Sequence, residues 1–130
     1  MNVTYNQKII DKSDESMRKI KQRFAKIMYT IESDAKRLAP VDTGYLRNNI
    51  HTDKISDTHF IVRSSANYSA CVEFGTKAHI IKPVEKQVLH WKKGEEDFFA
   101  KRVQHPGTTA QPFMRPAFKM AKLRLKKFIK

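Results

Sequence analysis

The side chains of this chain that could support metal or nucleophilic chemistry are too scattered to do so. The five histidines form no HxxxH or HxH pair, the spacings that bring two imidazoles to one metal ion. They are His51, His59, His79, His90 and His105. Cys71 is the only cysteine, which excludes an internal disulfide and a thiolate cluster, and we expect it to be a small buried residue. We therefore expect no catalytic residue, no metal and no cofactor.

The charge of the chain limits its partners. Lysine and arginine number 26 against 13 aspartates and glutamates, a formal net charge of +13, so polyanions should attract the protein. The partner classes that carry such negative charge are nucleic acid, a membrane surface and an acidic protein. No stretch approaches the roughly 18 apolar residues of a spanning helix, and the N-terminus lacks a basic segment followed by an apolar one. We expect neither membrane insertion nor secretion.

The C-terminal segment concentrates this charge. From Arg115 to Lys130 there are seven basic residues and no acidic one. The candidate contacts to DNA or to an acidic partner are Lys119, Lys122, Arg124, Lys126, Lys127 and Lys130. Lysine predominates over residues that bind base edges bidentately, so any DNA contact should be to phosphates, without sequence specificity and strongly salt-dependent. A solvated face is the alternative interpretation.

The spacing of apolar residues along the chain predicts the helices and strands that position these residues. Apolar residues recur every three or four positions from Ser13 to Ala39, which predicts a long amphipathic helix that Pro40 stops. Packing of this helix across a sheet is favoured over a coiled coil, because the repeat is short and Asp34 interrupts it. A second helix is expected over 116–130, with Ala117, Met120 or Ala121, Leu125 and Phe128 facing inward and the lysines and Arg124 outward.

Strand patterns occupy the middle of the chain. Asn49–Ser56 and Thr58–Ser64 predict a hairpin. Alternation over Tyr68–Phe74 predicts a strand with Glu73 exposed opposite the apolar face. Residues 77–107 predict a projecting hairpin insert with short strands near 80–81, 88–91 and 98–100, a turn at 92–96 and a loop over 105–109. The expected fold is α+β, one domain over 1–130 with a mostly antiparallel sheet and a flexible arm over 1–12.

Three short strings join these elements. In the first, 39–47, Asp42 can bond to nearby amides, Gly44 can take a positive φ, and Thr43 can cap a helical turn. In the second, 72–76, Gly75 ends the predicted strand. In the third, 110–117, Pro112 and Pro116 should keep 111–115 extended, with Phe113 as the core anchor and Arg115 as a candidate for binding a carboxylate or phosphate.

In this order and spacing, the three strings resemble the tail-completion, or head-to-tail joining, family of long-tailed bacteriophages and prophages. The resemblance covers Ile31 to Ala121 and implies a small α+β subunit without enzymatic activity. It implies a hexameric ring in the virion, after synthesis in the host cytoplasm, that completes the tail top or joins it to the head. For the free chain, a monomer is the alternative to this ring. The implied partners are copies of the chain itself, head-connector proteins, tail-terminator or tail-tube proteins, and DNA in the channel.

The resemblance also assigns the motif residues. The implied fold and subunit-contact positions are Asp42, Thr43, Gly44, Leu46, Arg47, Glu73, Phe74, Gly75, Thr76, Pro112, Phe113, Arg115, Pro116 and Ala117. Glu73 is expected to pair with Arg47 or with an arginine of a neighbouring subunit. Two other classes stay open: a small basic nucleic-acid-binding module, and an enzyme such as a nuclease, for which the chain offers only scattered histidines and carboxylates.

Overall fold

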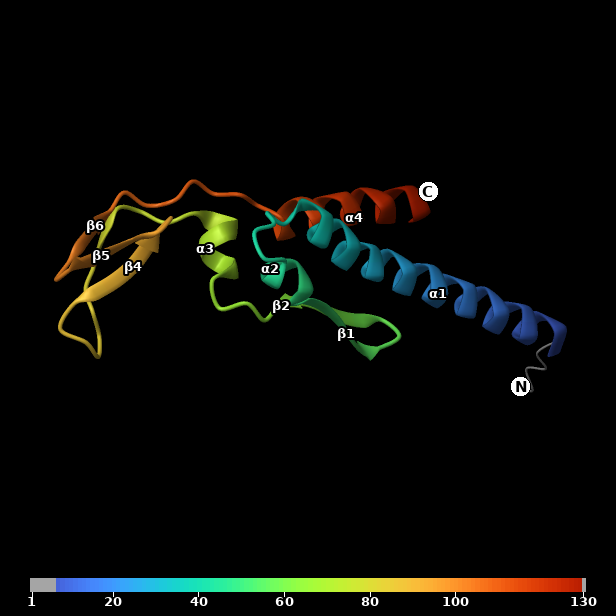
Figure 1. Cartoon of the computed structure of the whole chain (residues 1–130). Coiled ribbons are helices and arrows are strands. Elements are labelled where there is room, and N and C mark those ends of the chain that lie inside the picture. The colour runs from blue at the N-terminus through green and yellow to red at the C-terminus, as the bar shows by residue number, and fades with distance from the viewer. Residues whose placement is uncertain (1–6, 130) are drawn as a thin grey trace. The chain divides into compact units, whose positions relative to one another are not determined.

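The computed structural model describes residues 7–129, with side chains from Lys12 onward, and has the expected α+β composition (Figure 1). The chain divides into two compact units. Unit 1 comprises Met1–Ser69 and Pro112–Lys130, and unit 2 comprises Ala70–Gln111. The predicted insert thus corresponds closely to a separate unit, and each unit is described by itself.

Helix α1 (Gln7–Leu38) is the longest element of unit 1. Its apolar stripe and the basic residues Lys36 and Arg37 in its last turn suit a helix that ends before Pro40. The helix begins earlier than the predicted start at Ser13, because favourable helix formers precede that residue. A flexible arm over 1–12 is therefore wrong for residues 7–12, and its remaining residues, 1–6, lie outside the described part.

Helix α1 contacts both a hairpin and a second helix. Strands β1 (Ile50–Ser56) and β2 (His59–Ser64) pair antiparallel, with Ile50 opposite Ser64 and a register shift between Lys54 and Ser56. The ring of Phe60 on β2 meets Phe24 of α1 edge-on at 5.7 Å between centroids. Helix α4 (Met114–Ile129) lies beside α1 (Figure 1). Packing of α1 across strands is confirmed, and the helix pair adds a second contact.

The hydrophobic core of unit 1 forms where α1, the short helix α2 (Tyr45–Asn48), the hairpin and α4 meet. Its buried members are Ile31, Ala35, Ala39, Leu46, Ile50, Ala66, Phe113, Ala117 and Ala121. Small residues on both long helices let their backbones approach closely. Towards the N-terminus of α1 the stripe loses its cover, and Met17 and Ile20 remain 51% and 47% exposed.

Unit 2 consists of short ladders. Strands β3 (His79–Ile81) and β6 (Val103–His105) pair antiparallel, and between them in sequence β4 (Leu89–Lys93) pairs with β5 (Glu96–Ala100). The predicted insert strands and their turn are confirmed. Over residues 7–129, three two-stranded ladders replace the expected single sheet, and His105, expected in a loop, belongs to β6.

The strand predicted over Tyr68–Phe74 is wrong, because this segment forms helix α3 (Ser69–Phe74). Seven residues are too few for an alternating pattern to exclude a helical turn. The change of period reverses two expectations: Glu73 is 5% exposed instead of solvent-facing, and Cys71 is exposed instead of buried.

Candidate functional site

The first motif forms a tight corner between α1 and α2. Gly44 has φ 84° and precedes α2, and its carbonyl accepts a hydrogen bond from the Asn48 amide at 2.9 Å. The Tyr45 amide donates to the Thr43 hydroxyl at 3.4 Å, a long contact made from the residue before the N-cap. The positive φ of Gly44 is thus confirmed. Capping by Thr43 is not, because Gly44 itself occupies the N-cap position and no side chain caps α2. Asp42 lies exposed on the same corner.

Arg47 anchors this corner to the end of α1. Its Nε donates to the carbonyl oxygen of Lys36 at 3.2 Å, where a helix C-terminus leaves carbonyls without helical partners. Leu46 next to it is buried, and the exposed rings of Tyr45 and Tyr68 stack with centroids 6.1 Å apart. Pairing of Arg47 with Glu73 stays a prediction, because the two residues belong to different units.

The second motif is joined to the loop that precedes the third. Gly75, with φ 72°, follows α3, and Thr76 and Thr108 exchange backbone hydrogen bonds of 3.0 and 3.1 Å. The Gln111 amide donates to the carbonyl of Val72 at 2.8 Å. A Cβ on Gly75 would lie 2.6 Å from the Thr108 carbonyl oxygen, so only glycine fits this close approach.

The third motif starts α4 inside the core of unit 1. Phe113 is fully buried, as expected for the anchor, and Ala117 is buried one turn later. Helix α4 begins at Met114, whereas the sequence predicted an extended 111–115. Pro116 is accommodated because the amides of a first helical turn have no helical acceptor. Arg115 lies exposed in that turn.

A buried carboxylate connects the two long helices. Asp34 of α1 is 8% exposed, and its Oδ2 accepts a hydrogen bond from Nη1 of Arg124 on α4 at 2.6 Å. Nη1 of Arg124 also contacts the hydroxyl of Thr30 at 3.2 Å, and Arg37 donates to Oδ1 of Asp34 at 3.2 Å. The hydrogen bond from Arg124 holds the pKa of Asp34 below its ordinary value, against the opposing effect of burial. Arg124, expected to face outward, is therefore an interhelical residue.

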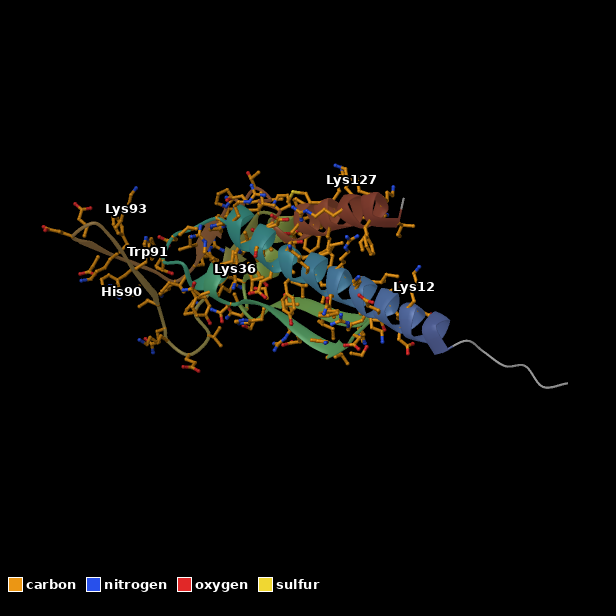
Figure 2. All side chains as sticks on the ribbon, turned by 90° about the vertical axis from the view of Figure 1, so that its right-hand side faces the viewer. Lys12, Lys36, His90, Trp91, Lys93 and Lys127 are labelled. Carbon is orange, nitrogen blue, oxygen red and sulfur yellow. The ribbon has the colours of Figure 1, made fainter. Side chains whose placement is uncertain are left out.

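The other basic side chains of α4 do face solvent. Lys119, Lys122, Lys126 and Lys127 are exposed, and Figure 2 shows Lys127 on the outer side of the helix. Lys130 lies outside the described residues. Four of the six predicted polyanion contacts therefore form an exposed basic face, which can attract phosphates or carboxylates without any specific geometry.

The β4–β5 hairpin of unit 2 displays aromatic pairs that the sequence pattern did not reveal. Trp91 and Phe98 stack with centroids 5.7 Å apart, and His90 stacks on Phe99 at 4.6 Å. His90 Nε2 also lies 2.8 Å from Oδ1 of Asp97. The pairs occupy opposite faces, because neighbouring strand residues alternate. The two-residue turn at Gly94 and Glu95 could have revealed this register. Figure 2 labels His90, Trp91 and Lys93 on β4.

The described residues hold no group of three or more histidine, cysteine, aspartate or glutamate side chains placed to bind a metal ion. Within the same part of the chain, no helix combines the length and apolarity needed to cross a membrane. Comparisons with protein-family models, curated proteins and solved structures each found no match.

Proposed function

We propose that the chain is a non-enzymatic structural protein of phage morphogenesis, a ring subunit that completes the tail top or joins the tail to the head connector in the virion. Its partners are copies of itself, head-connector proteins and tail-terminator or tail-tube proteins. The proposal combines the three ordered motifs with the arrangement of apolar residues described above.

The observation that carries the proposal is the exposed apolar surface of unit 2. Across Ala70–Gln111 the only buried residue is Glu73, while Trp91 and Phe99 are 41% and 65% exposed. Trp91 packs with Phe98 on one face of the β4–β5 hairpin and Phe99 with His90 on the other, and a neighbouring protein that covers these faces would remove the rings from water. A two-stranded hairpin is also marginal by itself in water. An assembly protein whose insert is covered by its neighbours accounts for both properties.

Electron microscopy of particles assembled without this protein tests the proposal. We expect filled heads and separate tails that fail to join if the protein acts at the junction, or tails of aberrant length if it completes the tube. Joined, infectious particles of normal tail length would contradict the proposal. So would a metal-dependent hydrolase activity abolished by a histidine substitution.

The exposed lysines of α4 support a second candidate, a small basic module that binds nucleic acid without sequence specificity. Such binding should weaken steeply with salt, with a logarithmic slope of about −0.9 per phosphate contacted. A filter or anisotropy titration with mixed-sequence duplex measures it. Replacing Lys119, Lys122, Lys126 and Lys127 by glutamine should make this slope shallower, by an amount that corresponds to the loss of up to roughly four phosphate contacts. Negligible affinity at low salt would exclude this function.

A further inference from the structure

A cleft of unit 1 is lined by both basic and apolar side chains. It has a volume of about 430 Å³ and lies between the N-terminal half of α1 and the last turns of α4. Its main lining residues are Ser16, Lys19, Ile20, Arg23, Lys26 and Phe128. The spacing of three and four residues places the α1 members on one helix face. The Arg23 guanidinium lies 5.5 Å from the centroid of the Phe128 ring.

This lining defines the chemistry of an occupant. Lys19, Arg23 and Lys26 attract negative charge, and only Lys19 has a described acidic partner, Glu15 at 2.8 Å. That pair is exposed on both sides and thus weak. Ile20 and Phe128 favour an apolar or aromatic group, which a phosphate backbone does not offer. The cleft therefore fits a peptide segment in which carboxylates adjoin aromatic side chains.

The same chain carries such a segment at the tip of the β4–β5 hairpin. Glu95, Glu96 and Asp97 form the only run of three consecutive acidic residues in the sequence, and Phe98 and Phe99 follow directly. All five are exposed. Asp97 contacts His90 at 2.8 Å and Lys92 at 3.9 Å, and Glu96 lies opposite Lys93, so the hairpin partly neutralises its own charge.

Both units carry a net positive charge, so the attraction comes from the acidic run at the hairpin tip and not from the charge of unit 2 as a whole. Unit 1 contains 19 of the 26 basic and 8 of the 13 acidic residues, whereas unit 2 contains 7 basic and 5 acidic ones. We propose that the β4–β5 tip of one copy docks in the α1–α4 cleft of a second copy. The contact joins two different surfaces, so successive copies add head to tail and close into a ring if the rotation permits. This inference rests on the proposed ring-forming function and names its subunit contact.

Complementary charge reversals test the contact by sedimentation velocity at low salt. One variant carries Lys19→Glu, Arg23→Glu and Lys26→Glu, and the other carries Glu95→Lys, Glu96→Lys and Asp97→Lys. The wild-type chain should self-associate. Each variant alone should associate at least about tenfold more weakly than wild type. An equimolar mixture of the two variants should regain association, because each cleft then meets a tip of opposite charge.

A matched control variant carries Lys119→Glu, Lys122→Glu and Lys127→Glu on α4 outside the cleft, and it should associate like wild type. Circular dichroism checks that every variant keeps its helical content. A wild-type chain that stays monomeric, or a mixture that fails to recover, overturns the docking contact. Loss of duplex-DNA binding on reversal of the cleft, with association unchanged, would also overturn it and assign the cleft to nucleic acid. The particle experiment decides the proposed function separately, since virions can require the protein whichever surface mediates its assembly.

Discussion

Unit 1 and unit 2 are stabilised by different means. In unit 1, side chains from α1, α2, the β1–β2 hairpin and α4 bury one another, and Asp34 joins the two long helices through Arg124. Unit 2 buries one residue, Glu73, and is held by short ladders, the Thr76–Thr108 bridge and glycines with positive φ. A buried core gives stability that packing substitutions should reduce, whereas a segment built from backbone contacts should respond mainly to changes in turn geometry.

The largest expected effect comes from truncating the core anchor of unit 1. Phe113→Ala should lower the free energy of unfolding by about 3–5 kcal/mol, because it removes a fully buried ring and leaves a cavity. Urea denaturation followed by circular dichroism measures the loss. The matched variant Phe99→Ala, in unit 2, should cost under about 1 kcal/mol, since Phe99 is mostly exposed. Equal costs would remove the distinction between the units.

Gly75→Ala should disrupt unit 2 locally. The new Cβ would lie 2.6 Å from the Thr108 carbonyl oxygen at φ +72°, so we expect a cost of about 2 kcal/mol or more. Gly94→Ala is the control, because φ is +67° there but no atom lies within 4 Å of the added Cβ. Hydrogen exchange at the amides of Thr76 and Thr108 should accelerate for the first variant only. Unchanged exchange in both would contradict the role of the close approach.

Removal of the charge pair between α1 and α4 should destabilise unit 1 by less than removal of the Phe113 side chain does. Asp34→Ala is expected to cost about 1–3 kcal/mol, because Arg124 loses its buried acceptor while remaining partly solvated. A double-mutant cycle with Arg124→Ala should show coupling between the two positions. If the two single costs add without coupling, the contact contributes nothing to stability.

The pH dependence of unit 1 follows from the same carboxylate. The pKa of Asp34 is lowered below its ordinary value of 3.8 by Arg124, so the unfolded state binds its proton more readily than the folded state. The stabilisation is present above pH 3.8 and is lost as pH falls through the lower folded pKa. Thermal melts at decreasing pH should show this loss, and Asp34→Asn should reduce it. An unchanged profile for that variant would assign the acid sensitivity to other carboxylates.

The smallest effect is expected at the first motif. Thr43→Ala removes the hydroxyl that accepts the Tyr45 amide, but at 3.4 Å this bond is long and exposed. We expect a loss of about 0.5 kcal/mol or less. A small shift in the urea midpoint of unit 1 would measure it, and a shift as large as that of Asp34→Ala would indicate a further role for Thr43.

The sequence predicted elements with regular and sufficiently long patterns. The stripe from Met17 to Leu38 and the alternating apolar residues around Ile50 and Val62 each fit one period, and both elements formed. Tyr68–Phe74 failed because seven residues with apolar side chains at 68, 70, 72 and 74 also allow a short helix that Gly75 ends. Arg124 was assigned to the outer face because its partner lies 90 residues away, although an aspartate within an apolar stripe was a sign that some cation would meet it.

For the candidate site, the special backbone at Gly44 and the burial of Phe113 followed from residue type. The burial of Glu73 and the aromatic pairs of β4 and β5 did not, because both depend on the period and register that a segment adopts. The net charge was easier to predict than the position of the charged surface. Composition gives the net charge directly, whereas only the packing of the helices shows which lysines remain exposed.

The separation between Asp34 and Arg124 has a consequence during synthesis. At the usual rate of about 5–20 residues per second, roughly 5 to 20 seconds pass between translation of the two positions. Throughout that interval the nascent α1 carries an apolar stripe without the helix that later covers it. Chaperones that hold emerging chains would meet this protein at its first helix, before the ribosome has released it.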